Sequence, residues 1–186
     1  PRAFPSEQAQ VERVEVLAGS ASVLYGNVFG VGGVMNRVTK KPSFARKNSL
    51  QLQSTDQEAT WRAVFDTTGP FRDSGKLAYR LIAVGQKADL VQDFSRLDRA
   101  SIFPSVTYRL DPQTPLHVET EFTLQSSSVG LVNGSRRTYV LNDRFVDVPD
   151  RANPEADFID SDLTKLGTVT TLLAKPSEQW SLRVAG

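Results

Sequence analysis

The chain has 186 residues, and its 22 basic and 21 acidic side chains leave a net charge of +1. This balance gives no electrostatic reason to expect a nucleic-acid partner. The absence of cysteine excludes disulfides, zinc–thiolate centres and thiol nucleophiles. No apolar run reaches the roughly 20 residues of a transmembrane helix, but a barrel strand needs only about 9–11 residues with one apolar face.

The first part of the chain predicts two strands joined by a glycine-rich connection. Residues 11–17 alternate between apolar and charged side chains, and residues 34–39 form a second strand-like run. Between them lie Gly26, Gly32 and Gly33, which permit tight turns and close backbone approach. We therefore expect a compact region rich in small residues.

The chain changes character after about Arg46, where alternating runs follow one another between turn residues. The run 115–126 shows the pattern best, because Leu116, Val118 and Phe122 alternate with Glu119 and Glu121. Successive side chains of a strand point to opposite faces, so such a run has one apolar and one polar face. Seven strands are expected, at about 47–54, 58–68, 76–86, 99–110, 115–126, 164–174 and 179–185.

The connections between these runs alternate in length. Every second one is tight, at 69–75, 111–114 and 175–178, whereas the connections at 87–98 and 127–163 are longer. Outer-membrane barrels have short periplasmic turns and longer extracellular loops. The first outer connection, Ser54 to Gln57, is short and departs from this pattern. Alternation by itself is also compatible with a soluble all-β domain whose apolar face packs inward.

Residues 11–42 carry a more specific signal, because they resemble the end of the plug domain of TonB-dependent outer-membrane receptors, especially the siderophore-receptor branch. The family pattern is roughly a strand ERVEVL, then RGP-S-LYG, a glycine pair, and VN-VTK. The matching residues are Glu12, Arg13, Glu15, Gly19, Ser22, Leu24, Tyr25, Gly26, Gly32, Gly33, Asn36, Thr39 and Lys40. The later runs also fit the early barrel of this family, so the resemblance covers nearly the whole chain.

The resemblance implies a mainly β fold, with residues 1–45 as the C-terminal part of a plug domain and residues 46–186 as about seven antiparallel strands of an incomplete transmembrane β-barrel. It implies active uptake of a ferric siderophore across the bacterial outer membrane, with no chemistry on the substrate and no cofactor or metal site. The partners implied are TonB with its inner-membrane complex, the chelate and outer-membrane lipid. We expect a TonB-contacting segment and the plug apices before Pro1, and about fifteen further strands after Gly186.

Three positions depart from the family pattern. Ala18 stands where the family has an arginine, and Ser20 stands where it has a proline. The turn from Tyr25 to Gly32 is one residue longer. In the family the arginine pairs with barrel carboxylates, and an alanine cannot do so.

The two faces of the strands are expected to meet different surroundings. A wide barrel leaves a lumen that a plug fills, so the polar face should meet the plug and trapped water. The charged residues assigned to this lumen face are Arg62, Asp66, Arg80, Arg109, Glu119 and Glu121. The residues expected to face lipid are Trp61, Phe65, Tyr79, Leu81, Ile102, Val106, Leu116, Val118, Phe122, Trp180 and Leu182.

Candidate ligand-binding residues lie in the long connection 127–163. Arg136, Arg137 and Tyr139 could grip an anionic iron chelate, because arginine forms charge-assisted hydrogen bonds and binding residues concentrate in loops. A basic pair in a long loop is also common as plain solvated surface. The sequence does not identify the ligand, and a vitamin, another metal chelate or a glycan stays open.

Other functions have weaker signals. The glycine-rich stretch from Gly26 to Gly33 lacks the Gly-Lys-Ser/Thr that a phosphate-binding loop needs. Glu119 and Glu121 could serve a soluble glycosidase, but paired carboxylates on one strand face are usually solvated. The single histidine, His117, could at most make a weak metal contact. A passive porin would lack the plug-like residues 11–42.

Overall fold

The computed structural model describes residues 7–18, 33–55, 60–73, 75–89, 95–110, 116–130, 138–141, 144–147, 160–177 and 179–186. The chain divides into two compact units, Pro1–Lys41 and Pro42–Gly186. No helix among the described residues is long and apolar enough to cross a membrane.

The first unit contains an antiparallel pair of strands. A short 3-10 helix, η1 (Gln8–Gln10), leads into β1 (Val11–Ala18), which pairs with β2 (Gly33–Thr39). The register places Glu15 opposite Asn36, and it shifts between Val11 and Arg13. The backbone N–H of Lys40 donates to the carbonyl of Gln10 at 2.8 Å and continues the pairing past the end of β2.

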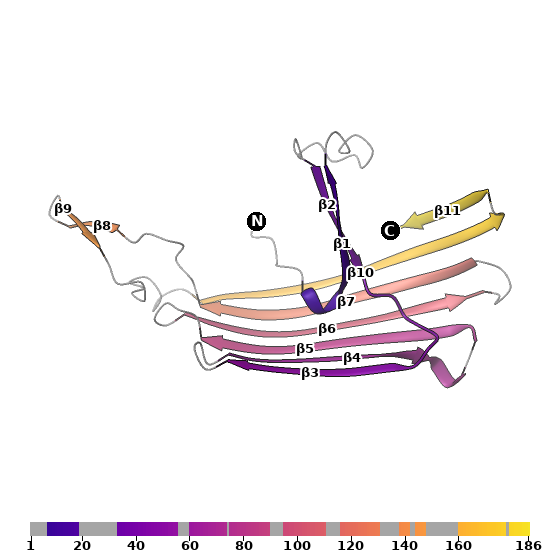
Figure 1. Cartoon of the computed structure of the whole chain (residues 1–186), viewed down its shortest axis with the longest axis horizontal. Helices are drawn as coiled ribbons and strands as arrows, with labels where there is room; N and C mark the ends of the chain where they lie inside the picture. Colours follow the sequence, from indigo (N-terminus) through magenta and orange to yellow (C-terminus); the bar gives the residue numbers. More distant parts are fainter. Residues whose placement is uncertain are drawn as a thin grey trace. The chain divides into compact units, whose positions relative to one another are not determined.

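The second unit contains a seven-stranded antiparallel sheet whose order follows the sequence, with β3 and β11 at its edges (Figure 1). Its strands are β3 (Lys47–Thr55), β4 (Thr60–Pro70), β5 (Leu77–Asp89), β6 (Arg96–Arg109), β7 (Leu116–Gly130), β10 (Asp160–Ser177) and β11 (Trp180–Ala185). All seven predicted strands are therefore present.

The connections lie where the prediction puts them. Because consecutive strands are antiparallel neighbours, the β3–β4, β5–β6 and β7–β10 connections share one end of the sheet. The tight β4–β5, β6–β7 and β10–β11 connections share the other end, and the first of these contains the 3-10 helix η3 (Phe71–Asp73). The longer connections 87–98 and 127–163 thus leave the sheet on the same side, as predicted.

Both long connections are shorter in the structure than predicted from the sequence. Strand β5 continues to Asp89 and β6 begins at Arg96, because the pairs Lys87–Asp98 and Asp89–Arg96 extend the ladder. Strand β10 begins at Asp160, opposite Gly130. The connection 127–163 also holds a small hairpin, β8 (Thr138–Leu141) and β9 (Arg144–Asp147), which the sequence analysis did not predict.

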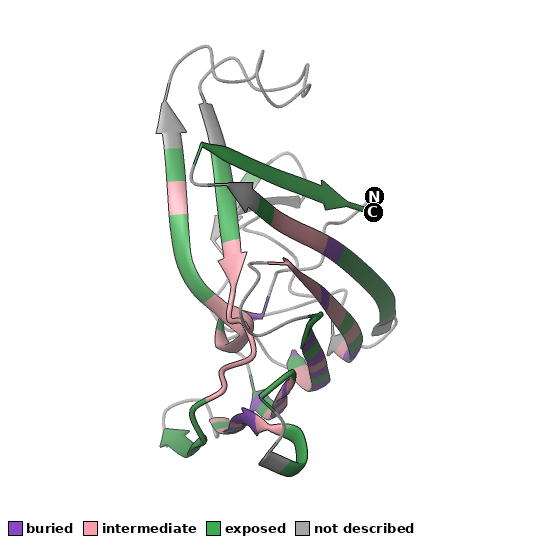
Figure 2. Cartoon of the chain, turned by 90° about the vertical axis from the view of Figure 1, so that its right-hand side faces the viewer, coloured by how far each residue is buried: buried purple, intermediate pink, exposed green. Residues whose placement is uncertain are grey.

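Burial alternates along the central strands (Figure 2). In β4, Val64, Asp66 and Thr68 are buried, whereas Trp61 and Phe65 are exposed. The register connects these alternations from strand to strand. We call the face that carries Asp66 the polar face, and the face that carries Phe65 the apolar face.

Candidate functional site

The polar face brings together all six charged residues that the sequence analysis assigned to a lumen. The register pairs Arg62 with Gln86, Arg80 with Thr68, and Arg109 with His117 across neighbouring strands. It also places the acidic residues of β7 opposite Thr107 and Ser105. The residues that share this face are Arg62, Asp66, Arg80, Arg109, Glu119 and Glu121. That this face meets a plug stays a prediction.

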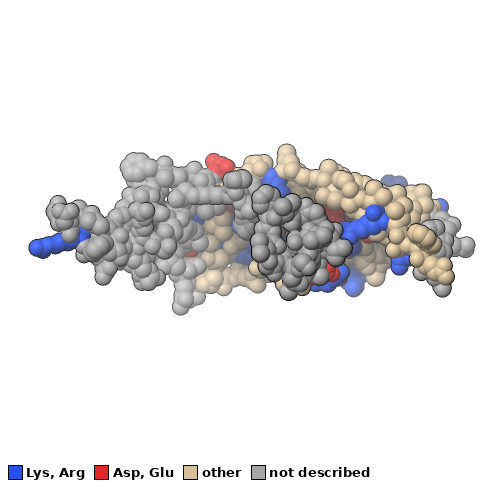
Figure 3. Space-filling model, turned by 90° about the horizontal axis from the view of Figure 1, so that it is seen from above, with Lys and Arg blue, Asp and Glu red and all other residues tan. Residues whose placement is uncertain are grey.

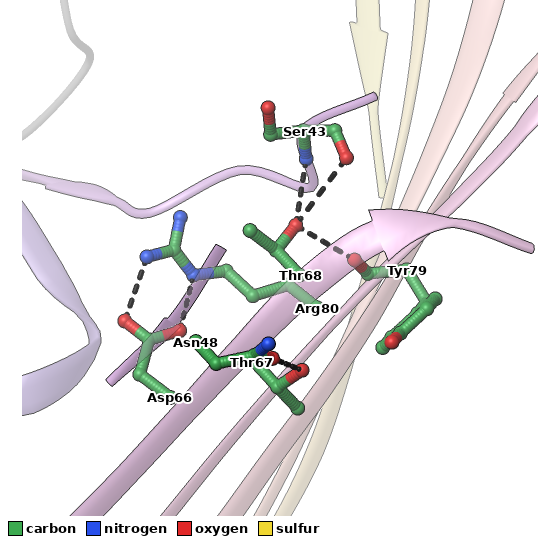
Figure 4. Close-up of polar contacts among 7 residues, drawn as sticks. All are labelled: Ser43, Asn48, Asp66, Thr67, Thr68, Tyr79 and Arg80. Atoms are coloured by element: carbon green, nitrogen blue, oxygen red, sulfur yellow. Dashed lines mark hydrogen bonds and ion pairs between the residues drawn. The ribbon is translucent and has the colours of Figure 1, made fainter. Parts of the chain in front are cut away.

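A bidentate ion pair on the polar face joins Arg80 to Asp66 (Figure 4). The guanidinium donates twice, from Nε to Oδ1 at 2.9 Å and from Nη2 to Oδ2 at 2.7 Å. The two side chains are 17% and 9% exposed, so the pair is largely withdrawn from solvent. A bidentate, charge-assisted pair of this kind fixes both side chains in one geometry. It ties β5 to β4 by a diagonal contact, because Asp66 lies opposite Ile82 rather than Arg80.

Weaker contacts follow the same face. Arg62 donates from Nη1 to Oε1 of Gln86, its direct cross-strand neighbour, at 2.9 Å. His117 Nε2 lies 3.9 Å from Oε1 of Glu119, two residues along β7. The polar face is not uniformly polar, because an apolar group lies among these charges. The buried apolar residues described on it are Val64, Ala78, Ile82, Val84, Ala88 and Phe103.

A cavity of about 410 Å³ lies at the tight-turn end of the polar face. One wall is the segment 42–45, and the other consists of Thr107, Arg109, His117 and Glu119. The guanidinium of Arg109 lies over the ring of Phe44, 3.7 Å from its centroid. The buried hydroxyl of Thr107 has no hydrogen-bond partner among the described residues. The cavity therefore has the polar lining and the size to hold water.

Two carboxylates of the polar face lie beside nitrogen-bearing side chains. The described residues contain no group of three or more His, Cys, Asp or Glu side chains that could hold a metal ion. Asp66 is engaged by Arg80, and the Glu119 carboxylate lies near His117.

The plug-like residues are described in part. In the β1–β2 pair, Glu15 accepts from Nδ2 of Asn36 and from Nε of Arg13, both at 2.9 Å. The hydrogen bond from Asn36, and then that from Arg13, lower the pKa of the Glu15 carboxyl below its ordinary value, because both stabilise the charged form. Glu12, Gly33, Thr39 and Lys40 are also described. Gly19, Ser22, Tyr25, Gly26 and Gly32 lie outside the described residues.

Of the three candidate ligand-binding residues, one lies in the described part of the chain, so their grouping stays a prediction. Arg136 and Arg137 lie outside it, and Tyr139 is in β8, opposite Val146. The sequence analysis also missed the contacts of segment 42–46 with the sheet. No pattern in the sequence marks these contacts, because they depend on the registers that place β4 and β6 on either side of β5.

The apolar face carries large exposed side chains. Phe65 is 41% exposed, Ile102 48% and Leu166 73%. All eleven residues predicted to face lipid share this face in the register. Seen from above, the described part of the molecule shows charged side chains at separate points among residues of other types (Figure 3). Large exposed apolar side chains gathered on one face of a sheet are typical of a contact with lipid or protein.

Comparison with known proteins agrees with this architecture. The chain is 34% identical over 182 residues to the metal-pseudopaline receptor CntO of Pseudomonas aeruginosa, covering 96% of the chain and 24% of the receptor. It is 32% identical over 104 residues to the ferrichrome outer membrane transporter/phage receptor of Escherichia coli, covering 56% of the chain and 14% of that protein. The chain is a homologue of TonB-dependent receptors for siderophores and metal chelates.

The fold of these receptors matches as well. The crystal structure of the ferripyoverdine receptor of Pseudomonas aeruginosa superposes with a TM-score of 0.85 at 22% identity, over 97% of this chain and 24% of that one. No protein-family model matches the chain. These two receptors match nearly the whole of this chain, and the chain spans about a quarter of the length of each. The relatives are transport receptors rather than enzymes.

Proposed function

We propose that this chain is part of an outer-membrane receptor that takes up a ferric siderophore or a similar metal chelate with energy from TonB, without chemistry on the substrate. The observation that carries the proposal is the 34% identity to a metal-chelate receptor along 96% of the chain. The two faces of the sheet supply the physical support, because each suits a different surrounding.

The apolar face has the dimensions of a lipid contact. Tyr79 and Tyr108 lie toward the tight-turn end, whereas Trp61 lies opposite Lys87 toward the long-loop end. Along β5, the eight steps from Tyr79 to Lys87 span about 26 Å at ~3.3 Å per residue. A strand tilt of ~40° reduces this to about 20 Å, close to the ~25 Å apolar band between the aromatic girdles of outer-membrane barrels. The proposed location is therefore the bacterial outer membrane.

The polar face suits the wall of a lumen that holds a plug. Its buried residues are mostly polar, and its charges are held by cross-strand contacts such as Arg80 with Asp66. We assign residues 1–45 to the C-terminal part of the plug and 46–186 to the first barrel strands. Ala18 stands where the family resemblance implies an arginine that pairs with barrel carboxylates, so the proposed plug lacks that pairing.

The substrate class follows from the relatives, whose names include metal-pseudopaline, ferrichrome and ferrioxamine B. A metal chelate other than a ferric siderophore is the second candidate, because the pseudopaline receptor is named for a metal complex. Arg136, Arg137 and Tyr139 are proposed as ligand contacts in the long loop, where an anionic chelate would meet charge-assisted donors.

Uptake of radioactive iron by cells that produce the full-length receptor tests the function. The probes are ferrichrome, ferrioxamine B and pyoverdine, each loaded with the isotope. We expect saturable uptake of at least one probe, and its loss when TonB is inactivated or the inner-membrane proton gradient is collapsed. The matched control is a strain that lacks the receptor gene. Uptake that rises linearly with concentration and survives loss of the gradient would indicate a passive porin instead.

A further inference from the structure

The segment 42–46, which we call the junction segment, opens the second unit and leads into β3. Its residues are Pro42, Ser43, Phe44, Ala45 and Arg46. The segment has no regular secondary structure, yet its neighbours on β4 and β6 hold it at several points. The covalent chain passes from the first unit to the sheet through this segment.

The first point is the hydroxyl of Thr68, a residue of β4 that is only 3% exposed. Thr68 Oγ1 accepts from the backbone N–H of Ser43 at 2.9 Å and donates to the carbonyl of Tyr79 at 2.8 Å (Figure 4). A hydroxyl has one proton and two lone pairs, so one side chain satisfies both bonds. It therefore links the junction segment to two strands at once.

Two further contacts shape the segment. The backbone N–H of Ala45 donates to Oγ of Ser43 at 3.1 Å, which bends the chain just before β3. The guanidinium of Arg109 stacks on the ring of Phe44 at 3.7 Å. A cation over an aromatic face within about 6 Å is attracted by the ring quadrupole. Arg46 packs so closely on Gly69 that a methyl group there would lie 3.0 Å from its Cγ.

The register of β3 and β4 shows where a force that pulls on the chain would act first. Lys47, the first residue of β3, lies opposite Thr68. Thr68 is therefore the β4 residue in the first pair of the β3–β4 ladder. Its hydroxyl also holds Ser43, which lies four residues before Lys47. A pull on the chain at Pro42 meets the contacts of Ser43 and Phe44 before it reaches the ladder. Without them, the force would act on the end of β3 and open its hydrogen-bonded pairs one after another.

We propose that the junction segment is the fixed anchor of the transport movement, with Thr68 and Arg109 as positioning residues that keep it on the sheet while the first unit moves. The movement then begins at Lys41, before the anchor, and β3 stays paired. This inference rests on the proposed function, since only an energised receptor applies such a force.

A reversible cross-link across the anchor tests the proposal. The variant Ser43→Cys with Thr68→Cys places thiols on two residues that are already joined by a hydrogen bond of 2.9 Å from the Ser43 backbone N–H to the Thr68 hydroxyl. The matched control is Asn48→Cys with Thr67→Cys, a directly opposite pair of β3 and β4 on the apolar face. If the segment stays in place during transport, the disulfide replaces the hydrogen bond of Thr68, so the oxidised form of the first variant should take up radioactive ferrichrome, ferrioxamine B or pyoverdine at least as fast as its reduced form. The two forms of the control should differ by less than about twofold. Uptake that falls tenfold on oxidation across residues 43 and 68 alone, and returns with reductant, would overturn the anchor.

Removal of one hydroxyl gives a second readout. Thr68→Val keeps the side-chain shape, and Thr67→Val is its control, because Thr67 donates to Asn48 at 2.6 Å on the opposite face. We expect Thr68→Val to lower the maximal uptake rate about threefold or more while the half-saturating concentration stays within twofold. The control should change neither. Equal behaviour of the two variants would show that Thr68 does not position the segment.

Hydrogen exchange of the junction segment needs no ligand, so it tests the anchor separately from the proposed transport function. In the full-length receptor the Ser43 amide should exchange at least threefold to tenfold faster in Thr68→Val than in Thr67→Val, the range expected for one lost hydrogen bond. An unprotected Ser43 amide in the unmodified receptor would disprove the anchor. If no probe is taken up by the unmodified receptor, the proposed function fails while the exchange result still decides whether the anchor exists.

Discussion

The two faces of the seven-stranded sheet differ in which side chains they bury, and the pattern is the reverse of that in a water-soluble sheet. On the polar face, Asp66, Thr107 and Glu119 are buried, whereas on the apolar face Ile102 and Leu166 are exposed. In a soluble protein the apolar face would be covered and the charges would meet water. The reversal agrees with the proposed contact of the apolar face with lipid and of the polar face with a plug and water. The predictions below test that difference.

The largest effect is expected from a charge placed at mid-strand on the apolar face. Ile102 lies in the middle of β6, between Ala83 and Leu124. Ile102→Arg should destabilise the receptor by about 2–4 kcal/mol, the cost of arginine near the bilayer midplane. Val118→Arg should cost only about 0–1 kcal/mol, because its neighbour Tyr108 marks the edge of the apolar band. Urea-dependent folding into lipid vesicles measures both.

The control for this comparison lies on the other face of β7. Glu119→Gln preserves shape and removes one charge at a position that meets no lipid in our assignment. It should be tolerated far better than Ile102→Arg. Equal sensitivity at these two positions would contradict the assignment of the faces.

A smaller effect is expected from the bidentate pair on the polar face. Asp66→Asn keeps the volume but leaves Arg80 without its carboxylate in a setting where the two side chains are 17% and 9% exposed. Loss of one partner of a fully buried pair costs about 3–5 kcal/mol, and residual solvation here reduces this to about 2 kcal/mol. The folding measurement in vesicles gives the value directly.

The hydrogen bond between Arg62 and Gln86 provides a neutral-acceptor comparison for the Arg80–Asp66 ion pair. Gln86→Met removes the neutral acceptor of Arg62 on the same two strands. The expected cost is about 1 kcal/mol, typical of one hydrogen bond. If Asp66→Asn costs no more than Gln86→Met, the salt bridge contributes nothing beyond an ordinary hydrogen bond, and the polar face is wetter than the structure indicates.

The strands could be predicted from the sequence because their signal is local. Alternation in segments such as 115–126 reports which side chains share a face, and tight turns mark where strands end. The family resemblance of residues 11–42 then pointed to the class of receptor. The strand ends were less accurate, because β5 and β10 extend past their alternating runs through pairing with β6 and β7.

The contacts that position side chains could not be predicted in the same way. The diagonal pair of Asp66 with Arg80 depends on the β4–β5 register, which the sequence leaves open. The stacking of Arg109 on Phe44 joins residues 65 positions apart, and neither is unusual by itself. The hairpin β8–β9 was missed because its strands have four residues each, too few for a periodic pattern.

The smallest effect is expected outside the sheet, in the exposed β1–β2 pair of the first unit. Asn36 and Arg13 lower the pKa of Glu15, so the carboxylate contributes stability above the pKa of an unfolded glutamate. This contribution is lost as the pH falls through the lower pKa of the folded state. A carbon-13 NMR titration of Glu15 should therefore give a midpoint below the ordinary glutamate value. Asn36→Leu should raise that midpoint, because it removes the largest cause of the shift, whereas Glu12→Gln at the neighbouring exposed position should leave it in place. A Glu15 midpoint at or above the ordinary value would show that the Asn36 and Arg13 hydrogen bonds do not persist in solution.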